Sequence, residues 1–221
     1  MTGNAAKRAF DAIVATIALI VLAPLLLIAA LAVKLDSPGP VFFTQQRIGR
    51  GGSSFRMFKF RTMVANAAHL GPNVSATGDS RLTRTGALLR RSFIDEAPQL
   101  LNVLKGDMSL VGPRPETPEY VKLLSPHELR ILAVRPGMAG PSTLEYSREE
   151  PAILARQDDP DGYYRTHLLH QRVAADLTYV DHWTLAADVS ILARTAVFVV
   201  SGVIESALNR SRAEEEVIRV P

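Results

Sequence analysis

Residues 9–35 form a long apolar run with a proline near its middle and basic residues on both sides. No charged residue occurs between Ala12 and Val33, which is long enough for a membrane helix, and no convincing signal-peptide cleavage site follows. Pro24 divides the run into two halves, each roughly 17 Å long as a helix and therefore close to one leaflet of a bilayer. Because proline removes a backbone donor, the run predicts a kink or break near Pro24.

The charges that flank this run favour one of two membrane arrangements. Lys7 and Arg8 precede it and Lys34 follows it, and positive residues prefer the cytoplasmic side. A re-entrant helix-break-helix keeps both basic flanks in the cytosol, whereas a single span leaves one of them outside. The charges and Pro24 therefore favour the re-entrant form. An ordinary kinked anchor is the alternative, because prolines are tolerated in spanning helices.

The composition of the remaining chain narrows the chemistry. The 221 residues include no cysteine, which excludes disulfides, thiolate catalysis and cysteine-ligated zinc. Between Val41 and Arg91 there are nine Arg or Lys residues and one acid, Asp79. A basic block just after a membrane segment predicts anionic partners, either membrane lipid head groups or phosphorylated ligands. Nothing resembles a nucleic-acid-reading motif, so we expect no nucleic acid partner.

The turn-forming residues and the apolar patterns between them predict a mostly helical α+β fold in three parts. These are a re-entrant membrane helix over residues 1–36, a small cytosolic domain over 37–208 and a polar, frayed tail over 209–221. The helix predicted at 185–208 is apolar but charged at Asp188 and Arg194, which is typical of an interfacial amphipathic helix or one packed on the domain. The other predicted elements are strands at 41–45 and 55–63 and helices at 87–93, 95–104, 118–133 and 163–181.

Adjacent carboxylates, Asp95 and Glu96, open the helix predicted at 95–104. Acids in a first helical turn commonly just offset the helix dipole. Here, however, Arg90 and Arg91 lie one turn upstream, within the cationic block. A carboxylate can attack a phosphoryl centre to give an acyl phosphate when cations and a metal screen the repulsion. The acid pair is therefore a candidate catalytic site.

Three further cations are candidate phosphate ligands. Lys59 and Arg61 lie on the second predicted strand, and Arg114 lies between Pro113 and Pro115, which restrict the direction of its guanidinium. A rigidly held fork of donors suits a diphosphate. The simpler alternatives are a solvated strand face and a loop arginine pointing into water. The histidines show no metal-ligand spacing.

Taken in order, these residues resemble a known family. Segments 92–100 (SFIDEAPQL) and 102–115 (NVLKGDMSLVGPRP) resemble the signature of the bacterial sugar transferases, the monotopic polyprenyl-phosphate phosphoglycosyltransferases. Residues 59–63 (KFRTM) and 134–137 (VRPG) are similar to further family elements, as is the membrane segment with its proline. The resemblance extends over about residues 7–200.

The resemblance implies an enzyme of the bacterial inner (cytoplasmic) membrane with its catalytic domain on the cytosolic face. It implies Mg²⁺-dependent transfer of sugar 1-phosphate from a UDP-sugar to polyprenyl (undecaprenyl) phosphate, the first membrane step of a glycoconjugate or polysaccharide pathway. Asp95 would be the nucleophile that takes the phosphosugar and releases UMP, and also the metal ligand. Glu96 would act as acid-base or metal-orienting partner. The residues implied to hold phosphates are Lys59, Arg61, Arg90 and Arg114.

Two departures limit what the resemblance implies. The residue before Pro24 is Ala23, where serine is frequent in the family, and residues 138–146 replace the familiar continuation after Gly137. The chain also lacks the extra N-terminal helices of larger members, so we expect the minimal catalytic form. The competing hypothesis is a membrane-anchored scaffold that only binds anionic lipids, although adjacent acids would repel such a ligand. The sugar, the pathway, the prenyl length and the oligomeric state, including a homodimer, stay open.

Overall fold

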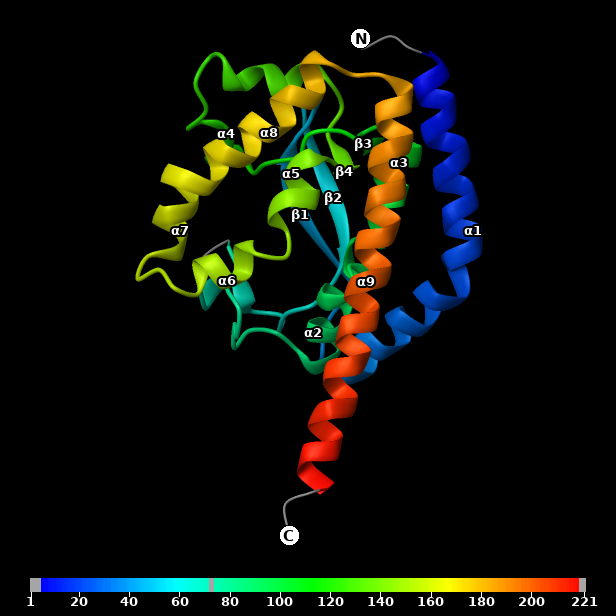
Figure 1. Cartoon of the computed structure of the whole chain (residues 1–221), viewed down its shortest axis with the longest axis vertical. Coiled ribbons are helices and arrows are strands. Elements are labelled where there is room, and N and C mark those ends of the chain that lie inside the picture. The colour runs from blue at the N-terminus through cyan, green and yellow to red at the C-terminus, as the bar shows by residue number, and fades with distance from the viewer. Residues whose placement is uncertain (1–4, 72–73, 219–221) are drawn as a thin grey trace.

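The computed structural model describes residues 5–71 and 74–218, with side chains except those of Ala68 and residues 203–218. The apolar run forms a single helix, α1 (Ala5–Asp36), with Pro24 inside it. Figure 1 shows that α1 bends part-way along, as expected for a helix that lacks one backbone donor and accommodates a proline ring. The predicted break near Pro24 is therefore a bend within one continuous helix.

Helix α1 packs on the rest of the protein with one face only. Ala15 joins the main hydrophobic core, while Ala29 and Val33 pack in a smaller cluster with Phe60. Small residues at these positions allow the helix to approach the domain closely. The opposite face exposes large apolar side chains: Ile13, Ile17, Ile20, Val21, Leu25, Leu27, Ile28, Leu31 and Leu35. A face of this kind suits hydrocarbon better than water.

Two small sheets accompany the helices. Strands β1 (Phe42–Ile48) and β2 (Ser54–Phe60) form an antiparallel hairpin in which Phe42 pairs with Phe60. Strands β3 (Ser109–Val111) and β4 (Gly137–Ala139) form a parallel pair. Together with the helices, these two small sheets confirm the mostly helical α+β class that the sequence predicts. The second predicted strand is shorter than expected, because β2 ends at Phe60 and not at Met63.

The segment that carries the acid pair is built from three short helices. Helix α2 (Arg84–Arg91) begins at Thr83, whose hydroxyl accepts a hydrogen bond from the Gly86 amide. A 3₁₀ helix, η3 (Ile94–Gln99), precedes α3 (Leu100–Lys105), so the helix predicted at 95–104 is divided. Pro98 accounts for this division because it has no amide to continue an α-helical ladder. Helix α3 ends at Gly106, which is left-handed with φ 88°.

Apart from β4, the regular structure of the C-terminal half is helical (Figure 1). The helix predicted at 118–133 is instead two short pieces, α4 (Pro118–Val121) and the 3₁₀ helix η4 (Glu128–Ala133), on either side of Pro126. The helix predicted at 163–181 contains a π-helical turn at Tyr164–Leu168. The remaining helices are α5 (Pro141–Tyr146), α6 (Glu150–Leu154), α7 (Pro160–Tyr163), α8 (Leu169–Asp181) and α9 (Leu185–Ile218).

Helix α9 lies beside α1 and extends beyond the domain (Figure 1). Lys7 Nζ of α1 lies 2.8 Å from Asp11 Oδ1 and 3.0 Å from Asp188 Oδ2 of α9, so a buried ion cluster joins the two helices. Both α1 and the part of α9 at 185–202 are long and apolar enough to cross a membrane. Helical backbone continues to Ile218, through most of the segment predicted to be a frayed tail. The predicted domain boundaries stay predictions.

Candidate active site

The acid pair owes its position to an unusual backbone turn. Among the described residues, Phe93 is the only non-glycine residue with a positive φ, at 56°, and it turns the chain from α2 into η3. Such a conformation persists only where surrounding contacts hold it. The Phe93 ring packs against Phe198 of α9, with centroids 5.0 Å apart. The turn places Asp95 and Glu96 in the first turn of η3, facing β2.

Glu96 is the anionic centre of the site. Its Oε1 accepts a hydrogen bond from Lys59 Nζ at 2.6 Å, and Arg114 Nη1 lies 3.8 Å from the same oxygen. Burial by itself would raise the pKa of Glu96, but the positive charges of Lys59 and Arg114 outweigh burial and hold the pKa at about 2. Glu96 is therefore ionised at neutral pH, which makes it an orienting anion for two cations and a poor proton donor.

Asp95 differs from its neighbour although the two are adjacent in sequence. Its side chain is buried, and burial raises its pKa to about 6. The charge of Glu96 raises the pKa further, whereas Lys59, Arg90 and Arg114 act in the opposite direction. Two carboxylates whose pKa values are driven apart in this way are typical of a site with divided roles. Asp95 is thus a poorly solvated carboxylate that is ionised at neutral pH, as a nucleophile requires.

Arg114 is held by a residue distant in sequence. Its backbone N–H donates to Asp176 Oδ2 of α8 at 2.9 Å. Asp176 also accepts from the amide and the hydroxyl of Ser142, at 3.0 and 2.8 Å. Pro113 and Pro115 restrict the loop, but the buried Asp176 supplies the actual anchor. The guanidinium consequently points at Glu96 and not into water.

Arg90, in the last turn of α2, is a further cation near Asp95. Its Nε donates to the Thr62 hydroxyl at 2.9 Å and its Nη1 donates to the Ser75 hydroxyl at 2.7 Å. Burial lowers the pKa of Arg90, and the nearby charge of Asp95 partly opposes that effect. The structure therefore brings together five of the predicted site residues: Lys59, Arg90, Asp95, Glu96 and Arg114.

Arg61 is the predicted site residue that the structure places elsewhere. Its Nη1 donates to the Pro38 carbonyl at 2.5 Å, and its Nη2 donates to the Ser37 carbonyl at 2.7 Å and the Val33 carbonyl at 3.2 Å. The alternation of a strand would put Lys59 and Arg61 on one face. Because β2 ends at Phe60, Arg61 leaves that face. In the structure it fastens the end of α1, apart from the acid pair, and its assignment to phosphate stays a prediction.

Comparison with known proteins places this arrangement in a family. The family model described as bacterial sugar transferase matches residues 2–202. The chain belongs to the bacterial sugar transferase family. The match covers α1, the hairpin, the acid pair and the first half of α9, so the site lies wholly inside the family's shared region.

Curated relatives of this sugar transferase carry related names. It is 42% identical over 194 residues to a UDP-glucose:undecaprenyl-phosphate glucose-1-phosphate transferase of Caulobacter vibrioides, covering 86% of this chain and 67% of that protein. It is 38% identical over 199 residues to a UDP-N-acetylgalactosamine-undecaprenyl-phosphate N-acetylgalactosaminephosphotransferase of Aeromonas hydrophila, covering 89% and 44%. It is 39% identical over 199 residues to the exopolysaccharide production protein PSS of Rhizobium leguminosarum bv. phaseoli, covering 86% and 93%. The chain thus spans two thirds of the first relative and less than half of the second.

The acid pair of this sugar transferase is also the place to consider for binding of a magnesium ion. Among the side chains that the structure describes, which exclude those of residues 203–218, no group of three or more His, Asp or Glu is arranged to hold a metal ion. Mg²⁺, however, commonly uses one or two carboxylates together with substrate phosphates. Glu96 is engaged by Lys59 at 2.6 Å, so Asp95 is the carboxylate that fits this role.

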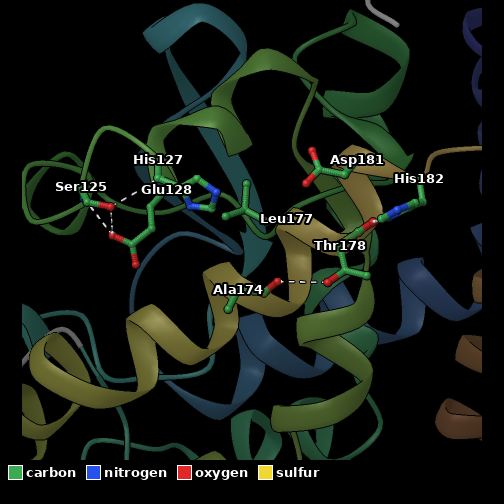
Figure 2. Close-up of a pocket in the computed structure, with 8 residues that line it drawn as sticks. All are labelled: Ser125, His127, Glu128, Ala174, Leu177, Thr178, Asp181 and His182. Atoms are coloured by element: carbon green, nitrogen blue, oxygen red, sulfur yellow. Dashed lines mark hydrogen bonds between the residues drawn. The ribbon is translucent and has the colours of Figure 1, made fainter.

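A pocket lies elsewhere in the sugar transferase, between η4 and α8. Figure 2 shows Ser125 and Glu128 at one end of it and Asp181 and His182 at the other. Ser125 and Glu128 are reciprocally hydrogen-bonded, an arrangement that caps η4. The pocket includes no member of the acid pair or its cations, and its polar groups have partners of their own, such as Arg130 for Asp181. Its other lining residues are His127, Ala174, Leu177 and Thr178.

The sequence did not predict the residues that contact the Pro-Arg-Pro loop and Glu116 next to the site. Arg47 Nη1 donates to the Pro115 carbonyl at 2.9 Å and lies 3.6 Å from Glu116 Oε2. The Tyr164 hydroxyl donates to the other Glu116 oxygen at 2.9 Å. Glu116 directly follows the Pro-Arg-Pro segment, and this position is the one sequence signal that could have indicated a role near the site. Nothing in their local sequence sets Tyr164 or Asp176 apart from ordinary helix residues.

Proposed function

We propose that this chain transfers a sugar 1-phosphate from a UDP-sugar to a polyprenyl phosphate at a membrane surface. The observation that carries the proposal is the acid pair: a buried Asp95 beside an ionised Glu96 that contacts Lys59 and Arg114. The names of the curated relatives support the substrate classes. They include different sugars, so the sugar is not part of the proposal.

The reaction is proposed to take two steps. In the first, an Asp95 carboxylate oxygen attacks the phosphorus that bears the sugar, and the bond from that phosphorus to the bridging oxygen breaks, releasing UMP. In the second, a phosphate oxygen of the polyprenyl phosphate attacks the same phosphorus, and the Asp95–phosphorus bond breaks. This restores the Asp95 carboxylate and yields a polyprenyl diphosphate sugar. Lys59, Arg90 and Arg114 lie where they can screen the phosphate oxygens.

Magnesium is proposed to bind at Asp95 together with the donor phosphates. When bound, the ion neutralises phosphate charge and so reduces the repulsion between a carboxylate and a diphosphate. The buried environment of Asp95 strengthens these electrostatic effects by excluding water. Glu96 serves as the fixed anion that keeps Lys59 and Arg114 aimed at the site.

The attachment of α1 supports a re-entrant membrane arrangement. Near its start, Arg8 donates to the carbonyls of Val103 and Leu104 at 2.5 and 2.6 Å. Near its end, Arg61 holds the carbonyls of Val33 and Ser37. A straight helix of 32 residues would be about 48 Å long. Because both ends of the bent α1 are fastened to one domain, a dip into one leaflet keeps the domain on the cytosolic face of the inner membrane, whereas a full span would draw it into the bilayer.

Cysteine labelling tests this topology. Single cysteines at Thr2, which lies outside the described residues, and at the exposed hairpin-turn residue Ser53 should both resist an impermeant thiol reagent in intact cells. Both should react after the cells are permeabilised, which controls for accessibility. The chain has no native cysteine, so the background is low. Labelling at Thr2 but not at Ser53 in intact cells would establish a span.

The pKa of Asp95 predicts how the first step depends on pH. Only the carboxylate can attack, and its pKa is about 6. The rate of adduct formation should therefore be constant above about pH 7 and fall towards tenfold per pH unit below pH 6. Glu96, with a pKa of about 2, stays ionised throughout and adds no second inflection. Single-turnover rates without lipid acceptor measure this directly, and a rate unchanged from pH 7 to pH 5 contradicts the assignment.

Release of UMP tests the function as a whole. Purified protein in lipid nanodiscs, given a panel of UDP-sugars, Mg²⁺ and polyprenyl phosphate, should release UMP with one of the sugars. A lipid-binding scaffold, the competing hypothesis, would bind anionic vesicles and release none. Absence of UMP with every sugar in the panel, from protein that binds vesicles, would favour the scaffold.

A further inference from the structure

Buried polar atoms without hydrogen-bond partners gather beside the acid pair. Across the described part of the chain, six buried side-chain nitrogen or oxygen atoms have no hydrogen-bond partner. Five of these atoms belong to four residues around the Pro-Arg-Pro loop. Such atoms are rare in folded proteins and ask for an explanation, of which a ligand is one. The five atoms are Arg47 Nε, Glu116 Oε2, Thr117 Oγ1, Arg172 Nε and Arg172 Nη2.

Arg172 is the most informative of these residues. Its side chain, on α8, is buried with 2% of the residue exposed. Its Nη1 donates to Glu150 Oε2, while Nε and Nη2 have no partner. Nε and Nη2 share one edge of the planar guanidinium, and their N–H bonds run parallel. That edge matches two oxygens of one phosphate.

The fold connects Arg172 to the acid pair. Arg172 and Asp176 are four residues apart on α8 and so share a face of the helix. Asp176 holds the backbone amide of Arg114, whose guanidinium lies 3.8 Å from Glu96. Arg172 therefore lies one turn along α8 from the residue that holds the loop carrying Arg114.

Arg47 approaches this loop from β1. Its Nη1 donates to the carbonyl of Pro115, the residue after Arg114, and its Nε is one of the buried atoms without a partner. Glu116 accepts from Tyr164 through Oε1, which leaves Oε2 without a hydrogen bond. Two arginines on different elements thus present unused donors near the one loop that carries Arg114.

We propose that Arg172, assisted by Arg47, binds the phosphate of the uridine monophosphate group that leaves from the donor. This rests on the proposed function and adds a second phosphate site to it. A buried guanidinium with one carboxylate on a single nitrogen is incompletely compensated, and an anion on the free edge compensates it better than a neutral group. When the bond to the bridging oxygen breaks, negative charge grows on this phosphate. A donor pair already in place stabilises that charge.

The test compares Arg172→Lys with the wild-type protein in calorimetric binding of UMP and of uridine. Lysine keeps the charge but cannot present two parallel donors. We expect UMP affinity to fall about 10- to 100-fold, a loss of the size expected for one charge-assisted bidentate contact, and uridine affinity to stay the same. Arg130→Lys is the matched control, since Arg130 pairs with Asp181 at the surface. It should bind UMP like wild type.

Each outcome separates this inference from the proposed function. Equal UMP affinity in wild type and Arg172→Lys overturns the inference and leaves the function intact, and so does an equal loss for uridine. A wild-type protein that binds no uridine nucleotide overturns the function itself. Thermal melting checks that the variant folds. Should it unfold, the double change Arg172→Gln with Glu150→Gln removes both buried charges together and should show the same selective loss of UMP.

Discussion

Replacing Asp95 with asparagine should abolish both turnover and the covalent adduct. Asparagine keeps the shape of the side chain but cannot attack phosphorus, so we expect a loss of at least about a thousandfold, the scale seen when a covalent nucleophile is removed. Incubation of wild-type protein with a sugar-labelled UDP-sugar and Mg²⁺, without lipid acceptor, should trap label on the peptide that contains Asp95. The same incubation of Asp95→Asn should leave the peptide unlabelled.

Asp181→Asn is the matched control, because Asp181 lies at the surface and pairs with Arg130. It should retain the adduct and turnover. Label on Glu96 in the wild-type protein would show that Glu96, and not Asp95, is the nucleophile. UMP that appears only when both substrates are present, without any adduct, would replace the two-step route with direct transfer.

The same variant should also change stability in a pH-dependent way. The pKa of Asp95 is raised to about 6 in the folded protein, from 3.8. Its proton therefore stabilises the fold fully below pH 3.8, and this contribution is lost as the pH rises through 6. At pH 8 the buried charge is destabilising, so Asp95→Asn should raise the free energy of unfolding by up to roughly 3 kcal/mol. At pH 4 the two proteins should differ little, which thermal melting at both pH values can check.

Replacing Arg114 with lysine should lower turnover about a hundredfold, equivalent to roughly 2–3 kcal/mol of transition-state stabilisation. A lysine ammonium is a point charge and cannot reproduce a planar fork on a diphosphate. The backbone bond from residue 114 to Asp176 survives this change, so the loop should keep its place. Steady-state kinetics at saturating donor measure the effect on turnover.

Arg130→Lys again serves as control, because it makes the same substitution at an ion pair outside the site. Full activity of Arg114→Lys would show that turnover does not need the planar guanidinium, and would leave Arg114 as a partner of Glu96 without a role in catalysis. A large loss in both variants would indicate a general intolerance of lysine and would remove the specific role assigned to Arg114.

Local pattern was sufficient for much of the fold. The charge-free run predicted α1, and local pattern also predicted strands close to β1 and β2. Each of these depends on neighbours in sequence, where propensity and periodicity act directly. The division of the helix at 118–133 followed from Pro126, a local signal that the sequence interpretation underweighted.

The candidate site was predictable in part for the same reason. Asp95, Glu96 and Arg114 stand in short motifs whose chemistry can be read directly, and the structure brings them together with Lys59 and Arg90. The contacts of Arg61 with the end of α1 were not predicted, because strand alternation was extended past the residue where β2 ends; its assignment to phosphate stays a prediction. The sequence did not predict the roles of Asp176, Tyr164 and Arg172, because the partners of these helix residues lie far away along the chain.

The sequence by itself determined the elements and the chemistry: an apolar helix bent at Pro24, a basic segment after it, and two adjacent acids with cations nearby. Only the tertiary structure decided which cations meet the acids and how the two acids differ. The pKa values of Asp95 and Glu96 diverge because Lys59 and Arg114 face one carboxylate more closely than the other. Those distances depend on how β2, η3 and the Pro-Arg-Pro loop pack together. Electrostatic energy varies with separation and burial, and neither quantity is encoded in local sequence.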